Sequence, residues 1–329
     1  MRTRFLIATL LVLALAPLAR ADGLPIADAS APAMIGGDGT DGRFVALPTE
    51  RGTVVARIGS SVYASRLLDG RYTVPVVALD HTAAGLSTDG STLVLINPRR
   101  TFPRTSFVVL GAKSLRTQRQ ILLQGDFSFD ALSPDGRRMF LIHYLSRRDP
   151  TRYEVRALDI PSGNLLPTPI VDKSQPDERM AGLPITRQTT ADGRWAYTLY
   201  DGAGHEPFVH ALNTIDGEAH CIDLEMLAGR QDLYDLRLDL GQGDSGLAVL
   251  SGSERVAVID RSTFEPVRAR TAASASHEAY SRNWAAIVLL SALAVLAAAA
   301  AIFGFRRVVG DRSARGARPA PERRSSLRA

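Results

Sequence analysis

Apolar and polar positions alternate over short runs between residues 40 and 270, a pattern typical of half-buried β-strands. Two clear runs are 153–158 (Tyr-Glu-Val-Arg-Ala-Leu) and 255–259 (Arg-Val-Ala-Val-Ile), both of strand length. Turns that contain Gly, Asp or Ser separate such runs. No long amphipathic helix pattern occurs between Asp38 and Arg270. The hydrophobic pattern therefore predicts an all-β body.

One turn motif recurs through this body, an Asp-Gly pair followed by a strand-like run. Gly accepts a positive φ and Asp can accept hydrogen bonds from its own backbone, so the pair suits a tight turn. Successive Asp residues are 48, 46, 57 and 52 positions apart. The copies are Asp41-Gly42, Asp89-Gly90, Asp135-Gly136, Asp192-Gly193 and a degenerate Asp244-Ser245-Gly246.

A second turn motif keeps a similar period, with each copy placed where a strand ends in an apolar residue. The copies are 68–70, 110–112, 158–163, 212–217 and 259–263. A period of about 40–50 residues with about four strands in each unit is typical of β-propeller blades. Five units predict about five blades. A sixth blade completed from residues 22–40 is one alternative, and a β-sandwich or two small β domains is another.

The Ser-Pro-Asp-Gly segment at 133–136 and the Asp-Ile-Pro-Ser-Gly segment at 159–163 resemble blades of bacterial WD40-like, TolB-like and YVTN-type propeller proteins. The resemblance covers roughly residues 40–270. It implies the fold and leaves the function open, because this group contains binding scaffolds, periplasmic accessory proteins, lactonases and oxidoreductases. The chain departs from the group in lacking a Trp-Asp dipeptide and a YVTN tetrapeptide.

The N-terminus has the pattern of a secretory signal peptide at residues 1–21. Arg2 and Arg4 precede an apolar stretch from residue 5 to residue 18, and Ala19 and Ala21 provide small residues at −3 and −1 of a cleavage site. The apolar stretch is short for a membrane span, so we expect cleavage rather than an uncleaved anchor. Residues 22–39 are rich in Ala, Pro and Gly and predict a linker before the repeat body at 40–270.

A second apolar segment, residues 284–305, predicts one C-terminal transmembrane helix. About 20 apolar residues span a bilayer core, Trp284 is placed as an interfacial aromatic, and Arg306-Arg307 follow the segment. Residues 271–283 are small and polar and predict a stalk. The tail, 306–329, contains eight Arg against Asp311 and Glu322 and is nearly free of apolar residues, which predicts a disordered segment.

Charge is distributed unevenly, and its distribution gives the orientation. The chain has a net charge of +5, but the tail alone carries +6, so the body is mildly acidic. The positive-inside rule then places the tail in the cytoplasm and the body outside it, in the cell (inner) membrane. The positive net charge does not indicate a nucleic-acid partner, because the excess positive charge is not on a folded domain.

The choice of residues indicates a bacterial protein. Nearly all of the 39 basic residues are Arg, which is usual in GC-rich bacterial genomes. The single cysteine, Cys221, excludes an intramolecular disulfide, although exported animal domains of this size more often contain several. A buried structural role is the expectation for Cys221.

Two motifs point weakly to catalysis or metal binding. Gly243-Asp244-Ser245-Gly246 matches the core of a serine-protease nucleophile motif, but no segment supplies the oriented His that would activate the serine. His205 and His210 are five positions apart with Pro207 between them, so they do not form a zincin helix. A loop arrangement could still bring them near a metal together with His220.

Other polar residues have a structural explanation that we prefer. Trp195 heads a strand and is expected to pack in the core. Two groups of arginines are expected in solvated loops, with a basic patch for an anionic ligand as the alternative. They are Arg147, Arg148 and Arg152, and Arg99, Arg100 and Arg104.

The resulting hypothesis is a membrane-anchored, extracytoplasmic propeller that binds or scaffolds an envelope protein or polymer. We assign no catalytic, cofactor or metal residue. The alternatives are a lactonase- or hydrolase-like propeller enzyme, with Asp126, Asp130, His143 and Glu154 as candidates at a central channel, and a receptor. No Leu-Pro-x-Thr-Gly motif precedes the apolar segment, which argues against sortase processing. The sequence leaves the oligomeric state open.

We predict that the membrane-extracted protein consists of residues 22–329. Its intact mass should show loss of the signal peptide after Ala21 and retention of the C-terminal segment. A mass that lacks residues 284–329 would instead mean that this segment is a processed sorting signal.

Overall fold

The computed structural model describes residues 29–36, 42–97, 104–146, 149, 151–175, 180–241 and 246–269. The chain divides into two compact units, Met1–Ala269 and Arg270–Ala329, and all described residues belong to the first. The predicted signal peptide, stalk, transmembrane segment and tail lie outside them. Within the described residues, no helix has the length and apolar character needed to cross a membrane.

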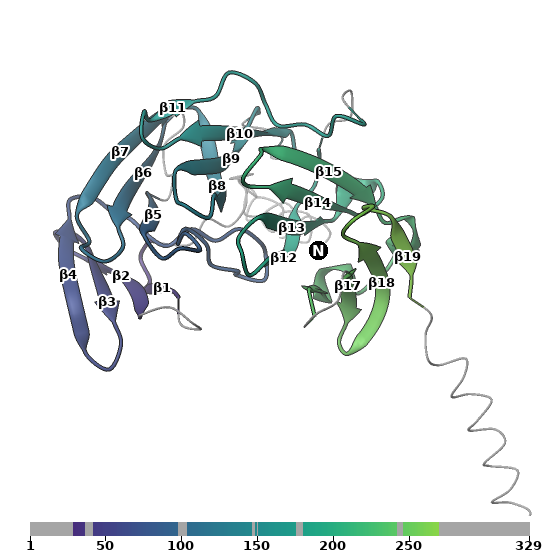
Figure 1. Ribbon diagram of the computed structural model, residues 1–329, viewed down its shortest axis with the longest axis horizontal. Coiled ribbons are helices and arrows are strands. Elements are labelled where there is room, and N and C mark those ends of the chain that lie inside the picture. The colour runs from purple at the N-terminus through teal and green to yellow at the C-terminus, as the bar shows by residue number, and fades with distance from the viewer. Residues whose placement is uncertain are drawn as a thin grey trace, which may run out of the picture. The chain divides into compact units, whose positions relative to one another are not determined.

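The described residues form five antiparallel sheets, each built from strands that are consecutive in the sequence (Figure 1). We call them blades 1 to 5. Blade 1 contains β1 (Ala33–Ile35), β2 (Arg43–Thr49), β3 (Gly52–Ile58) and β4 (Val62–Leu68). Blade 2 contains β5 (Thr92–Asn97), β6 (Arg104–Gly111) and β7 (Thr117–Gln124). Blade 3 contains β8 (Asp126–Leu132), β9 (Arg138–Tyr144), β10 (Tyr153–Asp159) and β11 (Asn164–Leu165).

The last two blades follow the same up-and-down order. Blade 4 contains β12 (Pro184–Thr189), β13 (Trp195–Tyr200), β14 (Phe208–Asn213) and β15 (Glu218–Asp223). Blade 5 contains β16 (Leu236–Asp239), β17 (Gly246–Ser251), β18 (Glu254–Asp260) and β19 (Pro266–Arg268). Three short 3-10 turns also occur, at Gly202–Gly204, Glu225–Leu227 and Leu233–Asp235. The expectation of an all-β propeller is confirmed.

Successive blades pack face to face, because the strands carry apolar side chains on both sides of each sheet. Separate clusters of buried side chains join blades 1 and 2, 2 and 3, 3 and 4, and 4 and 5. Among the described residues, no such cluster joins blade 5 to blade 1. Each internal blade therefore has two apolar partners, and each end blade has one.

The Asp-Gly motif forms the turn between the first two strands of a blade, with the same hydrogen bonds in the three copies that the structure describes. In blade 3, the Ser133 hydroxyl donates to the Asp135 carboxylate at 2.6 Å, and the Gly136 N–H donates to the Ser133 carbonyl at 2.9 Å. The Arg138 N–H donates to the Ser133 hydroxyl oxygen at 2.9 Å. Equivalent bonds form in the turns at Asp89 and Asp192. The predicted periodicity thus has a physical basis.

The second motif forms the turn between the last two strands in blades 2 to 5, but its predicted first copy is misplaced. The strands flanking residues 68–70 show that this segment follows β4 and ends blade 1. The corresponding turn of blade 1 is at 59–61, where no Asp occurs, and the Gly59 N–H donates to the Ser61 carbonyl. The copy was placed at 68–70 because the Asp69-Gly70 pair there is a stronger turn signal than Gly59-Ser60-Ser61.

A hairpin at residues 75–84 was not predicted from the sequence. The segments around it pair with β5 through Thr73–Ile96 and Leu86–Leu93 bridges, so they take the innermost strand position of blade 2. At the hairpin tip, the Leu79 and Asp80 N–H groups donate to carbonyls of β12 at 2.9 and 3.2 Å. The hairpin therefore connects blade 2 to blade 4 past blade 3, along the inner edges of the sheets.

The N-terminal boundary of the repeat body also differs from the prediction. β1 falls within the stretch expected to be a linker, because Met34 pairs with Val45 and extends the first sheet. The described part of residues 22–40 therefore contributes the first strand of blade 1, and the structure forms no sixth blade from it.

We predict that Gly136→Ala destabilises the protein more than Gly90→Ala does. Each glycine has a φ of +67° at the equivalent position of its own Asp-Gly turn. Each alanine therefore incurs the left-handed backbone cost of about 1 kcal/mol. A Cβ at Gly136 would also collide with the Thr92 side chain, whereas a Cβ at Gly90 meets nothing. We expect an additional loss of about 1–3 kcal/mol in the free energy of unfolding, measured by denaturant titration. Equal losses would contradict this packing of neighbouring turns.

Candidate functional site

The face of blade 1 that points away from blade 2 is apolar and has no covering sheet among the described residues. Strand register places seven large apolar side chains on this face, beside Ala56, Arg43 and Ser65, and none of the seven belongs to a core cluster. We call it the outer face of blade 1. It consists of Met34, Val45, Leu47, Val54, Ile58, Val62 and Leu67.

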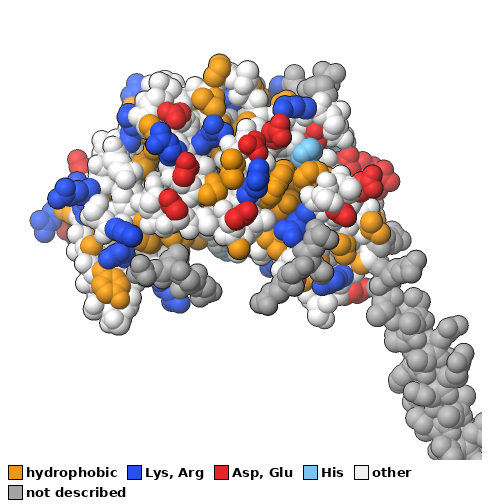
Figure 2. Space-filling view, in the orientation of Figure 1, with side chains coloured by type: hydrophobic (Ala, Val, Ile, Leu, Met, Phe, Trp, Pro, Cys, Tyr) orange, Lys and Arg blue, Asp and Glu red, His pale blue; other side chains and the backbone are white. Residues whose placement is uncertain are grey.

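Four of these side chains are exposed, with Met34 at 51%, Leu47 at 37%, Val62 at 62% and Leu67 at 49%. Figure 2 shows charged side chains of both signs dispersed over the visible surface, with hydrophobic side chains also visible over the sheet of β1–β4. The opposite face of blade 1 packs on blade 2, so one face of this sheet is buried and the other is exposed. Clustered apolar exposure of this kind is typical of an interaction surface.

A second candidate lies between blades 3 and 4. Direct cross-strand pairing puts four residues of blade 4 in one row, on the face that looks toward blade 3. We call it the polar row. It consists of Arg187, Thr198, His210 and Cys221, on β12, β13, β14 and β15 in turn.

The inner end of the polar row is a buried ion pair between Arg187 and Asp130 of blade 3. A β-bulge at Asp130 interrupts the pairing of β8 with β9. The Arg187 guanidinium donates to the Asp130 carboxylate and carbonyl, and its Nε donates to the Thr198 hydroxyl at 2.9 Å. Each charged side chain is only 3% exposed, so each depends on the other for compensation of its charge.

His210 is the unusual member of the polar row. It is 1% exposed, and neither ring nitrogen has a hydrogen-bond partner among the described residues. Desolvation lowers the pKa of His210 from 6.5 to about 4, although the Asp130 carboxylate acts in the opposite direction. The imidazole is therefore neutral near pH 7, with one nitrogen able to donate and the other able to accept.

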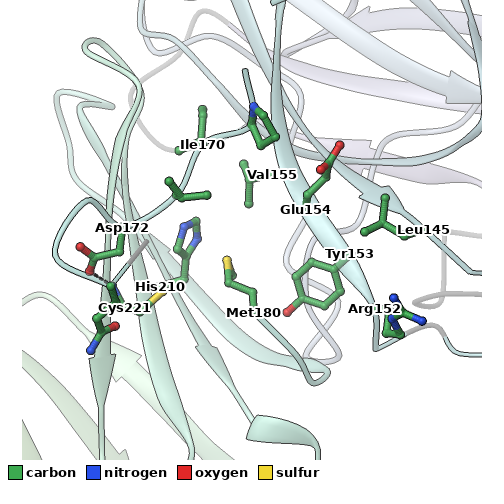
Figure 3. A pocket seen from close by; sticks show the side chains of 13 residues that line it. Leu145, Arg152, Tyr153, Glu154, Val155, Ile170, Asp172, Met180, His210 and Cys221 are labelled. Carbon is green, nitrogen blue, oxygen red and sulfur yellow. Dashed lines mark hydrogen bonds between the residues drawn. The ribbon is translucent and has the colours of Figure 1, made fainter. Parts of the chain in front are cut away.

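The outer end of the polar row opens into a pocket of about 510 Å³ (Figure 3). His210 and Cys221 line it from blade 4, and blade 3 and the segment between β11 and β12 supply the other walls. Apolar and polar side chains both contribute to these walls. The apolar lining residues are Leu145, Tyr153, Val155, Pro169, Ile170, Val171 and Met180.

Asp172 lies at the same pocket, but its carboxylate is already used. It accepts hydrogen bonds from the Ser174 hydroxyl and N–H at 2.6 and 2.8 Å, and from the Cys221 N–H at 2.8 Å. Burial raises the pKa of Asp172, and these hydrogen bonds outweigh that effect, so the net shift is downward. Asp172 therefore anchors the connecting segment to β15.

The structure does not bring the three predicted histidines together. His205 is exposed at the end of the first 3-10 turn. His210 faces blade 3, whereas the adjacent register position puts His220 on the opposite face of blade 4, where it stacks on Phe264 with ring centroids 4.0 Å apart. Among the described residues, no group of three or more His, Cys, Asp and Glu side chains is arranged to hold a metal ion.

The four acidic and histidine candidates for a central channel also lie at different places in the structure. His143 and Glu154 share a hydrogen bond of 3.1 Å, and His143 stacks on Phe127 of the core between blades 2 and 3. Asp130 instead pairs with Arg187 toward blade 4, and Asp126 is buried at the start of β8. In Figure 3, the Glu154 carboxylate points away from His210. These four residues do not converge on one site.

The remaining predicted residues are distributed over the molecule. Trp195 packs against the core between blades 4 and 5, as expected. Cys221 is half-buried at the pocket rather than fully buried. Arg104 is exposed on β6, and Arg152 is at the rim of the pocket. The Asp244-Ser245 segment and the other four loop arginines lie outside the described residues.

Sequence reasoning missed Arg187, Gln175, Met180 and Asp172 as neighbours of His210. Only the sequence pattern of β12 could have indicated Arg187. There a charged residue lies in a strand whose preceding residues are buried. The other three come from an irregular connection whose path no periodicity predicts.

Comparisons with known proteins give no family. No protein-family model matches the chain, and no curated protein matches it in sequence. Solved structures with similarity include a putative TolB from Agrobacterium tumefaciens, at 15% identity over 69% of this chain and 76% of that chain, with a TM-score of 0.34. BamB from Moraxella catarrhalis gives 18% identity over 71% and 65%, with a TM-score of 0.38. The Dos1 propeller gives 6% identity over 74% and 58%, with a TM-score of 0.43.

The chain therefore spans less than two thirds of the BamB and Dos1 structures. With TM-scores below 0.5, these similarities carry no argument about function. The assignment of a propeller fold rests on the five sheets of the chain itself.

We predict a specific pH dependence of stability from His210. Unfolding exposes the imidazole to water and restores its ordinary pKa, so the unfolded chain takes up a proton between about pH 6.5 and 4 that the folded chain does not. The contribution of His210 to the free energy of unfolding should be complete above pH 6.5. It should fall by about 3 kcal/mol as the pH decreases to about 4.

Urea titrations across this pH range, on the full chain and on His210→Phe, would measure the effect. The variant should lose this part of the pH dependence, and His205→Phe should retain it because His205 is exposed. An unchanged pH dependence in His210→Phe would refute the assignment.

Proposed function

We propose that the protein is a single-pass membrane protein that presents its propeller outside the cytoplasm as a binding module for an envelope protein. The observation that carries the binding role is the outer face of blade 1. The membrane anchor and the orientation come from the predicted segment at 284–305 and the basic tail at 306–329.

The shape of the surface supports a protein partner. Successive strands β1 to β4 all contribute apolar side chains to this face, on a sheet whose other face is fixed against blade 2. A surface of rigid strands loses little conformational entropy on binding. Removal of its aliphatic side chains from water by a partner lowers the free energy of the complex.

The distribution of polar residues also favours binding over catalysis. The acidic and histidine candidates point to different blade interfaces, and Asp130 is neutralised by Arg187. The hairpin at 75–84 runs along the inner edges of blades 2 to 4, where a central active site would have to open. A hydrolase role would need a constellation that the described residues do not supply.

We predict that the double variant Leu47→Ser, Leu67→Ser loses the partner in in-cell cross-linking of the tagged full-length protein. Leu47 and Leu67 both pair with Val54, so they are neighbours in one row of the outer face. Loss of two leucine contacts should reduce recovery of the cross-linked protein at least about tenfold. Both positions are solvent-exposed, so the stability of the chain should change little.

The matched control is Leu122→Ser, which removes an exposed leucine from β7 of blade 2. The control should retain the cross-linked partner. Recovery that is unaffected by the double variant would refute blade 1 as the binding surface, and a cross-link only to a second copy of the chain would replace the envelope partner by self-association.

A further inference from the structure

We propose that the pocket between blades 3 and 4 binds an uncharged small molecule that has an apolar body and a hydroxyl or N–H group, with the His210 imidazole as its hydrogen-bonding partner. This site is separate from the outer face of blade 1 and does not depend on the function proposed for that face. Four features of the pocket support the proposal.

The first feature is its size and lining. A volume of about 510 Å³ is within the range of small-molecule sites, and the lining combines apolar side chains with polar groups such as His210 and Gln175. Val155 and Ile170 form one wall, and Met180 lies across from them in Figure 3. These side chains would cover the apolar body of a ligand.

The second feature is the unsatisfied imidazole. A buried polar group without a partner costs free energy, which makes such groups rare in folded proteins. Among the described residues, His210 has no partner for either ring nitrogen at the wall of the pocket. The Gln175 side-chain oxygen at the same pocket is also buried, with no partner in the part of the chain that the structure describes. A ligand that donates to His210 or Gln175 would recover part of this free energy.

The third feature is the rigid support of the imidazole. Cross-strand neighbours Thr198 and Cys221 flank His210 on β13 and β15. The Cys221 N–H points away from β14 to Asp172, so His210 and Cys221 form a non-hydrogen-bonded pair, in which side chains lie closest. The imidazole is therefore held within the sheet, as part of the wall of the pocket.

The fourth feature is the charge balance, which selects an uncharged ligand. Arg187 and Asp130 compensate each other, and the Asp172 carboxylate is saturated by Ser174 and Cys221. Glu154 bonds to His143 and Arg156 on the far side of blade 3. Arg152, which has no charged partner among the described residues, is exposed at the rim, so a charged ligand in the interior of the pocket would lose its hydration without meeting a counter-charge there.

Indole and indene test the proposal, because they have nearly the same shape and only indole has an N–H donor. Equilibrium dialysis against the purified full-length protein, corrected for partition into the detergent, gives both dissociation constants. We expect indole to bind at least about tenfold more tightly than indene, the discrimination expected from one buried hydrogen bond. Equal affinities, or no binding of either probe, would overturn the proposal and leave a water-filled pocket.

Variants identify the site. His210→Phe removes both nitrogens and should abolish the preference for indole, whereas His205→Phe changes an exposed histidine outside the pocket and should retain it. Met180→Trp should fill the cavity from the connecting segment and weaken binding of both probes at least tenfold, without altering β14. If His210→Phe fails to fold, the Met180→Trp result decides. Indole binding that survives Met180→Trp would overturn the proposal.

Discussion

The packing of apolar sheet faces against each other is the constraint on which the rest of the structure depends. A four-stranded blade has two faces and buries neither alone, so each blade needs a neighbour on both sides. Blade 3 meets this need with Phe127 and Leu141 toward blade 2 and with Val155 and Tyr144 toward blade 4. The end blades lack one neighbour each among the described residues, and the outer face of blade 1 is the result. This exposed apolar surface thus follows from the repeat architecture.

Burial between blades also explains the unusual chemistry at blade 4. An interface made for apolar residues contains Arg187, Thr198 and His210 in direct register. Arg187 is tolerated because Asp130, displaced by a bulge, meets it from blade 3. His210 has no such partner among the described residues, so desolvation outweighs the opposing Asp130 charge and lowers its pKa to about 4. The same desolvation makes the imidazole a neutral hydrogen-bonding group at the pocket.

Connections between the blades position both the rigid and the open parts of the molecule. The hairpin at 75–84 is an insertion into the inner strand of blade 2, and its tip bonds to β12, which braces blades that are not adjacent. The segment between β11 and β12 has a different role. It is tied to β15 through Asp172 and brings Met180 and Gln175 over the polar row.

The sequence by itself determined the strand class, the repeat and the main turn chemistry, because those depend on neighbours within a few residues. The bonds of Ser133 to Asp135 and of Gly136 to Ser133 are local, so the Asp-Gly motif marks the turn wherever it occurs. The turn at 59–61 and the hairpin at 75–84 were missed because they lack that local pattern. Only the tertiary structure decided that His210 and His220, ten positions apart, face opposite interfaces, and that Asp130 meets Arg187 across 57 positions. Strand register and blade packing set those contacts, and both arise from long-range burial that no short stretch of sequence encodes.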